Sequence, residues 1–188
     1  MRTLRVSRLA PVLLALAALA ACKSLRGPDV PHPLNGASRR LCCNLYYEKT
    51  SISDVNYQVG TKIPFGTPVH IERVRRDSVE FTPEGHPTIS LDYKYGAKTT
   101  PFDTYLDRLF VENDPRRDLK KVPAKRVSAI EEGRIEQGMP KAQVMMARGI
   151  PPAHRTPSLD SSVWMYWQNR WDTISVYFAG DKVERVGH

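Results

Sequence analysis

The chain has 188 residues, and its 28 Lys and Arg against 20 Asp and Glu give a formal net charge of +8. The hydrophobic content of 41% excludes a wholly disordered chain, and three Cys exclude a disulfide-dense scaffold. The only long apolar run stands at the start of the sequence, which excludes a polytopic membrane protein. The length allows one domain or two small ones.

Residues 1–21 have the pattern of a secretory signal peptide. Three Arg and no acidic residue precede an apolar run from Leu9 to Ala21. A helix of that length spans about 20 Å, which is too short for a hydrocarbon core of about 30 Å. A basic start followed by a short apolar stretch is typical of a signal peptide rather than of a membrane span.

The run ends Leu19-Ala20-Ala21-Cys22, which resembles the bacterial lipobox. The resemblance implies cleavage before Cys22 and attachment of a diacylglyceryl group to its thiol; an ordinary Ala-x-Ala cleavage beside an incidental Cys is the alternative. Two or more acyl chains give stable anchoring. Lys23, in place of an inner-membrane retention Asp, favours the outer membrane. We expect a lipid-anchored protein on the periplasmic face of the outer membrane, with membrane lipids and not nucleic acid as partners.

A tether is predicted after the leader. Without residues 1–21 the chain keeps 25 basic and 20 acidic residues, a net charge of +5. Residues 22–40 are rich in Pro and Gly and poor in large apolar side chains. This composition predicts a segment that holds the folded part away from the bilayer.

Cys42 and Cys43 are adjacent, and the periplasm is oxidising. Their Cα atoms are expected about 3.8 Å apart, below the usual disulfide range of about 4.4–6.8 Å. Four arrangements are open: a vicinal disulfide, a bridge to another chain, one buried thiol beside an exposed one, or a nucleophilic Cys paired with His70, His86 or His154.

Residues 41–115 are predicted to form a β-rich unit. Residues 88–95 alternate strictly between apolar and polar side chains. The apolar residues that share one face are Ile89, Leu91, Tyr93 and Tyr95. Shorter runs of this kind, separated by Pro- and Gly-rich turns, predict a small barrel or sandwich of antiparallel strands. Residues 60–71 resemble the opening of bacterial Src-homology-3-like domains.

One helix is predicted inside this unit. An apolar stripe recurs at helical spacing from Phe102 to Phe110. Thr100 is the expected cap, and Pro101 suits the first helical position. Asp103 and Asp107 lie four residues apart on this helix, either as a carboxylate pair for acid–base or metal chemistry or as two solvated charges.

Residues 116–126 carry six basic residues and one acidic residue, a net charge of +5. The six are Arg116, Arg117, Lys120, Lys121, Lys125 and Arg126. A solvated basic linker between two folded units is one interpretation. Contact with anionic headgroups or an acidic partner is the other.

Residues 127–188 are predicted to form a second unit. Ser128 and Glu131 have the spacing of a capping box, and Pro140 followed by Gly149 marks the start and stop of another helix. The expected apolar side of this second helix consists of Met139, Ala142, Met146 and Ile150. Strands are predicted at residues 164–167, 173–178 and 182–186. Two helices packed on a three-stranded antiparallel sheet form a two-layer unit, so the expected fold class is α+β.

A family pattern runs through this second unit. Its residues are, in order, Ile135, Gly138-Met139, Val144, Gly149-Ile150-Pro151, Trp164-Met165-Tyr166, Val176-Tyr177-Phe178 and Gly180. They resemble the SmpA/OmlA (BamE-like) family of outer-membrane lipoproteins. Pro140 stands where the family has Ser or Thr, and Arg148 where Leu is common. The resemblance implies the two-layer fold and a role in outer-membrane protein assembly, with an envelope protein such as the barrel-assembly machinery as partner.

Aromatic and basic residues gather near the first strand of this unit. The candidate partner-binding residues are His154, Arg155, Trp164, Tyr166, Trp167, Arg170 and Trp171. Trp, Tyr and Arg are typical of interface hot spots. Alternation places Trp164 and Tyr166 on one face of the strand and Trp167 on the other, so both faces cannot meet the helices. An exposed face marks a partner site; otherwise the first unit or Trp171 covers it.

The sequence contains no phosphate-binding loop, nucleophile elbow or metal-ligand spacing, and its five His are dispersed. We therefore expect no catalytic residue, cofactor or metal. The expected function is a non-catalytic binding or scaffold module in outer-membrane protein assembly or envelope integrity. The alternative is another periplasmic binding module, either an enzyme inhibitor or a peptidoglycan binder that uses the β-rich unit.

Overall fold

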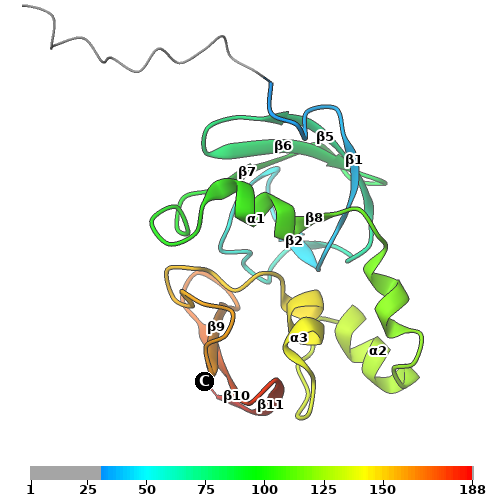
Figure 1. Ribbon diagram of the computed structural model, residues 1–188, viewed down its shortest axis with the longest axis vertical. Coiled ribbons are helices and arrows are strands. Elements are labelled where there is room, and N and C mark those ends of the chain that lie inside the picture. Colours follow the sequence, from blue (N-terminus) through cyan, green and yellow to red (C-terminus); the bar gives the residue numbers. More distant parts are fainter. Residues whose placement is uncertain (1–30, 188) are drawn as a thin grey trace, which may run out of the picture. The chain divides into compact units, whose positions relative to one another are not determined.

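The computed structural model describes residues 31–187 (Figure 1). The expected signal peptide, the lipidation site Cys22 and the tether up to residue 30 lie outside these residues. Residues 32–187 belong to one compact unit. Its fold is α+β, with three α-helices and several sheets in the described part. No helix within residues 31–187 is long and apolar enough to cross a membrane.

A six-stranded sheet dominates the N-terminal part of the unit. Its strands, in spatial order, are β3 (Ser51–Ser53), β7 (Ile89–Asp92), β6 (Ser78–Pro83), β5 (Pro68–Val74), β1 (Ser38–Leu41) and β8 (Phe110–Val111). Neighbouring strands are antiparallel except β3 and β7, which run parallel. β2 (Leu45–Tyr47) and β4 (Thr61–Ile63) form a separate pair. The predicted barrel is wrong, because the edge strands β3 and β8 do not pair and no closed barrel exists among the described strands.

β7 is shorter than the alternating pattern predicts. It ends at Asp92, and Tyr95, which alternation places on the buried face, is 39% exposed. The cause is Asp54, whose buried carboxylate accepts hydrogen bonds from the backbone N–H groups of Lys94, Tyr95 and Gly96. These bonds hold the chain in a turn and so end the strand.

α1 (Phe102–Leu109) packs against the core of the six-stranded sheet. The residues that it buries are Tyr105, Leu106 and Leu109. Pro101 precedes the helix rather than beginning it, and no side chain caps the N-terminus. The predicted Thr100 cap is therefore wrong; the carbonyl of Thr100 instead accepts a hydrogen bond from the Tyr93 hydroxyl (2.7 Å).

The C-terminal part contains a 3-10 helix, Pro115–Leu119, followed by α2 (Ala124–Glu131) and α3 (Lys141–Arg148). A three-stranded antiparallel sheet follows (Figure 1), and its strands in spatial order are β11 (Lys182–Gly187), β10 (Thr173–Ala179) and β9 (Val163–Trp167). This sheet confirms the predicted three-stranded meander. α2 begins four residues before the predicted capping box, so Ser128 lies inside the helix, where its hydroxyl donates to Glu132 (2.7 Å).

α3 ends at Gly149 (φ +90°), as its sequence predicts, but its buried side differs from the prediction. Ala142 is exposed, whereas Val144 and Ala147 are fully buried. Pro140 stands at the N-cap position, directly before the first helical residue, and not at the first helical position as predicted. The buried face of α3 is therefore centred on Val144 and Ala147, which lie three residues apart, and not on the predicted side that contains Ala142.

Two hydrophobic clusters form the core of the unit. The first joins the six-stranded sheet to α1, and the second joins α2 and α3 to the three-stranded sheet. They interlock: Phe65 lies in the second cluster, Ile150 lies in the first, and Met145 packs against both. The two parts thus pack as one unit rather than as two folded units on either side of a linker.

Two segments expected to be solvated belong to this unit. In the basic segment 116–126, Leu119 is 7% exposed. The backbone N–H of Arg116 donates a hydrogen bond to the side chain of Asp114 (3.0 Å), which caps the 3-10 helix. Within the expected tether, Leu34 is 8% exposed and β1 is an inner strand of the six-stranded sheet. Both segments therefore belong to the folded unit, which begins at residue 32.

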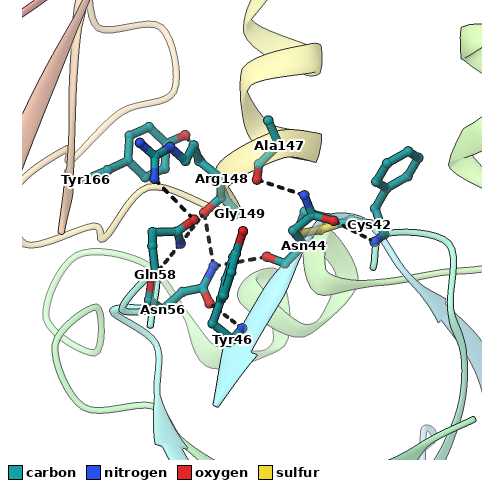
Figure 2. Close-up of a disulfide and its surroundings, with 11 residues drawn as sticks. Cys42, Asn44, Tyr46, Asn56, Gln58, Ala147, Arg148, Gly149 and Tyr166 are labelled. Atoms are coloured by element: carbon teal, nitrogen blue, oxygen red, sulfur yellow. Dashed lines mark hydrogen bonds between the residues drawn. A yellow bond between two sulfur atoms is a disulfide. The ribbon is translucent and has the colours of Figure 1, made fainter. Parts of the chain in front are cut away.

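Asn44 joins the two parts through hydrogen bonds (Figure 2). Its side chain is fully buried, and its Nδ2 donates to the carbonyl oxygens of Ile130 and Ala147 (3.0 Å each). Its Oδ1 accepts from the backbone N–H of Phe65 (3.0 Å), and its own N–H donates to the carbonyl of Met146 (2.9 Å). Both amide hydrogens and the amide oxygen are thus satisfied.

Asn56 and Gln58 bind the C-terminal end of α3 (Figure 2). Their side-chain amides both donate to the carbonyl of Arg148 (3.0 and 3.1 Å), and Asn56 also donates to the carbonyl of Asn44 (3.1 Å). Carbonyls at a helix end lack partners inside the helix, so these side chains cap α3. Gly149 follows at positive φ, and a Cβ there would collide with Nδ2 of Asn56.

Candidate partner-binding surface

Two of the predicted partner-binding residues belong to the core. Trp164 is 1% exposed and its ring centroid lies 4.9 Å from that of Phe178. Tyr166 is 2% exposed and its hydroxyl donates to the carbonyl of Gly149 (3.1 Å), while burial raises the pKa of that hydroxyl. The prediction that these two residues bind a partner is wrong, because their face of β9 packs in the cluster that contains α2 and α3.

The opposite face of β9 carries Trp167, which is half-buried beside side chains from both parts of the unit. Its ring meets that of Tyr57 edge-on, with 6.2 Å between centroids. The guanidinium carbon of Arg155 lies 5.9 Å from the centroid of the Trp167 ring. These contacts are of the cation–π and edge-to-face kinds that hold aromatic side chains in fixed orientations.

Tyr95 and His154 extend this group, with 5.3 Å between their ring centroids. Tyr57 and Tyr95 line one cavity of about 420 Å³ together with Arg170. We call this group the aromatic–cationic surface, and its members are Tyr57, Tyr95, His154, Arg155, Trp167 and Arg170. It takes residues from both parts of the unit, so it exists only when the unit is folded.

Guanidinium groups supply the charge of this surface. Arg155 and Arg170 are exposed and make no ion pair with any residue in the described range. Burial lowers the pKa of His154, and repulsion by Arg155 lowers it further, so this imidazole is neutral at pH 7. Burial raises the pKa of the Tyr57 hydroxyl. The surface therefore presents neutral rings beside unpaired positive charge.

Trp171 stands next to this surface in the loop between β9 and β10, and it is 92% exposed. The loop is ordered by side chains: Oδ1 of Asn169 accepts from the backbone N–H groups of Trp171 (2.8 Å) and Asp172 (2.9 Å). Gln168 adds a bond from its side chain to the Asp172 carboxylate (2.9 Å). The exposed indole is thus presented by a hydrogen-bonded turn.

The structure brings together four of the seven predicted partner-binding residues: His154, Arg155, Trp167 and Arg170. It separates Trp164 and Tyr166 from them. Tyr57 and Tyr95 were missed by the sequence analysis. Alternation assigned Tyr95 to the buried face of the predicted strand, whereas the strand ends before it. Tyr57 carried no signal, because it lies in a loop.

The basic residues of segment 116–126 divide into two sets. Arg116 donates to the carbonyl of Phe65 (3.1 Å) and pairs with Asp114 (3.4 Å), and Arg126 pairs with Glu136 (3.5 Å). The other four are exposed and make no ion pair among residues 31–187; they are Arg117, Lys120, Lys121 and Lys125. These four are the cations that remain available to an anionic partner.

Replacing these four cations by Gln should weaken binding of the leaderless chain, residues 23–188, to vesicles that contain an anionic phospholipid. Each basic residue near such a surface contributes about 1 kcal/mol, so the expected loss is about 4 kcal/mol at low salt and vanishes at high salt. Vesicle co-sedimentation measures it. The matched control neutralises four other exposed cations, Arg73, Arg76, Lys98 and Lys182. Equal losses in the two variants would show that only net charge matters.

The two adjacent cysteines are joined by a disulfide, with their Cα atoms 3.8 Å apart. Cys42 is 8% exposed and Cys43 is fully buried. This pairing corrects three of the four arrangements, because neither Cys42 nor Cys43 keeps a thiol for another chain, for an exposed position or for a nucleophile beside a histidine. A bond between neighbours closes almost no loop, so it adds little chain-entropy stabilisation. Its effect is local, on the backbone directly before Asn44.

Acidic and histidine side chains do not gather into a metal site in the part of the chain that the structure describes. Asp103 and Asp107 on α1 are both exposed, and Asp103 lies 3.4 Å from Nε2 of His32. Comparison with protein-family models, with curated proteins and with solved structures gives no match for this chain.

Proposed function

We propose that the protein is an outer-membrane-anchored periplasmic lipoprotein that acts as a non-catalytic binding or scaffold module in outer-membrane protein assembly or envelope integrity. The observation that carries the proposal is Trp171, an indole 92% exposed on an ordered turn beside Arg170. Burying a Trp side chain removes roughly 150–250 Å² of surface from water, at about 25 cal/mol per Å². A partner that covers Trp171 and the aromatic–cationic surface gains that free energy.

The architecture of the C-terminal part supports the family assignment in this proposal. α2 and α3 share one hydrophobic cluster with the antiparallel sheet β9–β11, which is the arrangement implied by the SmpA/OmlA resemblance. The lipobox-like Leu19-Ala20-Ala21-Cys22 supports the membrane anchor. Ten peptide steps from Cys22 to His32 reach at most about 35 Å, so an anchored unit stays close to the bilayer surface.

The experiment is an in-cell crosslink of the tagged, lipidated protein, followed by pull-down from solubilised outer membranes and mass spectrometry. We expect recovery of an envelope assembly protein, with the barrel-assembly machinery as the first candidate. Trp171→Ala should lower that recovery about tenfold or more, because truncating a hot-spot residue costs about 2 kcal/mol or more. Val186→Ala is the matched control, since Val186 is also exposed but lies on β11.

Fractionation tests the anchor separately. Cys22→Ser should move the protein from the membrane fraction to the periplasm, because no acyl chain can be attached. A Cys22→Ser protein that stays with the membrane would contradict the lipid anchor. Recovery of murein fragments or of one periplasmic enzyme, in place of an assembly protein, would replace the assembly role with the alternative binding role.

A further inference from the structure

A second cavity, of about 440 Å³, lies between α1 and residues 150–160. It contains no member of the aromatic–cationic surface. Its volume falls in the range of small-molecule sites, about 300–1,000 Å³. The cavity is lined by apolar side chains from the loop after α3, including Ile150, Pro151 and Leu159, and by polar side chains from α1.

Tyr105 on α1 lines this cavity with a hydroxyl that has no partner. The side chain is 6% exposed, yet its hydroxyl makes no hydrogen bond to any residue of the described range. Burial raises the pKa of this hydroxyl, so it is a donor at every physiological pH. The Tyr105 hydroxyl is therefore a hydrogen-bond donor that no described residue occupies and that lines a cavity open to a ligand.

Arg108 lies one turn further along the same face of α1 and also lines the cavity. It is half-buried, and it makes neither an ion pair nor a hydrogen bond within residues 31–187. Its charge lowers the otherwise raised pKa of Tyr93, whose side chain forms part of the cavity wall. A guanidinium and a phenol from one helix thus line the same cavity, and no carboxylate pairs with the guanidinium within residues 31–187.

The acidic residues of the cavity leave Arg108 available. Both carboxylate oxygens of Asp54 are occupied by the backbone N–H groups of Lys94, Tyr95 and Gly96 (2.6–3.1 Å). Asp160 is exposed on the opposite wall and makes no ion pair with Arg108. Their negative charge disfavours a dianionic phosphate more than it disfavours a monoanion.

We propose that this cavity binds a carboxylate carried by a small apolar or aromatic group. The planar Arg108 guanidinium donates two parallel hydrogen bonds to the two carboxylate oxygens, and the Tyr105 hydroxyl donates a third. The apolar walls take the attached group. A peptide C-terminus and a free organic acid share this chemistry. The proposal goes beyond the binding role of the aromatic–cationic surface, and neither depends on the other.

The test titrates the leaderless chain, residues 23–188, which contains the whole compact unit, and follows backbone amide chemical shifts of α1. The probes are N-acetyl-glycyl-phenylalanine, the same dipeptide as its amide, benzoate and inorganic phosphate. We expect both carboxylates to saturate the shifts of α1 and the amide to leave them unchanged. Tighter binding of the dipeptide identifies a peptide C-terminus as the source, and tighter binding of benzoate identifies a free acid.

Variants assign the binding to the cavity. Arg108→Gln should weaken carboxylate binding about tenfold, and Tyr105→Phe, which removes one oxygen, about threefold. Arg73→Gln, which removes an exposed cation on β5, should have no effect. Three results overturn the proposal: the amide or phosphate binds as well as the carboxylates, a folded Arg108→Gln binds as the parent does, or neither carboxylate saturates by about 10 mM.

Discussion

Replacing Asn44 by Ala should lower the free energy of unfolding by about 3–5 kcal/mol, the largest single-residue effect that we expect in this protein. The substitution leaves two buried backbone groups without partners, the carbonyl of Ala147 and the N–H of Phe65. It also removes one donor from the carbonyl of Ile130, which keeps the N–H of Gly133 (3.1 Å). Each unsatisfied buried group costs about 1–3 kcal/mol, and partial relaxation keeps the sum below the maximum.

Urea unfolding of the leaderless chain, followed by tryptophan fluorescence and by circular dichroism, measures this effect. The matched control is Asn113→Ala, because Asn113 is exposed and bonds only to the Arg117 side chain among the described residues. That variant should stay within about 0.5 kcal/mol of the parent. A loss below about 1 kcal/mol for Asn44→Ala would mean that the hydrogen bonds of the Asn44 side chain contribute little to holding the two parts together.

The protein should lose stability steeply above about pH 10, because Tyr105 and Tyr166 are buried as neutral phenols. Burial raises the pKa of both hydroxyls in the folded state, while in the unfolded chain each titrates near 10. The stabilisation is therefore fully present below pH 10, and it is lost as the pH rises, since the unfolded state releases its protons first. These two groups contribute a slope of up to about 2.7 kcal/mol per pH unit, and the raised pKa values of Tyr46, Tyr57 and Tyr93 add to it.

Urea unfolding at pH 8, 9, 10 and 11, with tyrosinate absorbance as a second probe, measures this slope. Tyr105→Phe should lower the slope above pH 10 by up to about 1.4 kcal/mol per pH unit. It should cost little at pH 8, because the Tyr105 hydroxyl makes no hydrogen bond to a described residue. Tyr166→Phe should lower the slope by a similar amount, but should cost about 1–2 kcal/mol at pH 8, because the Gly149 carbonyl loses its donor. A slope that neither substitution changes would assign the alkaline transition to other groups.

Local patterns in the sequence predicted where the elements lie. Alternation placed β5, β6 and β7, the apolar stripe from Phe102 placed α1, and Gly149 marked the end of α3. The three-stranded meander was also predicted, because its strands are consecutive and joined by short turns. Each of these features depends on side chains within about ten residues of one another, and the sequence displays such neighbours directly.

The helix starts were predicted less well, because capping depends on which nearby group reaches the free N–H groups. Thr100 and Ser128 both had suitable spacing, yet neither caps a helix. A proline occupies the N-cap position of each α-helix in the described residues: Pro101, Pro123 and Pro140 stand directly before α1, α2 and α3. Proline has no N–H, so it removes one of the four N–H groups that lack partners at a helix start; no side chain caps the others.

The candidate site was predicted in part. Alternation showed that Trp164 and Tyr166 share one face of a strand and that Trp167 lies on the other, but it did not show which face the helices cover. The choice depends on contacts with α2 and α3, which the pattern of one strand does not contain. Tyr57 contacts Trp167, which is more than a hundred residues away in the sequence, so no local pattern predicts that contact.

The sequence by itself determined the type and order of most elements and the surplus of positive charge in residues 116–126, whereas the signal peptide and its lipid anchor stay predictions. Only the tertiary structure decided that segment 116–126 is folded, that Asn44 and Asn56 bind α3, and that Tyr105 and Arg108 line one cavity. The physical reason is the distance along the chain over which each interaction acts. Periodicity and turn chemistry act between neighbours in the chain, whereas burial, ion pairing and buried hydrogen bonds depend on partners that folding alone brings together.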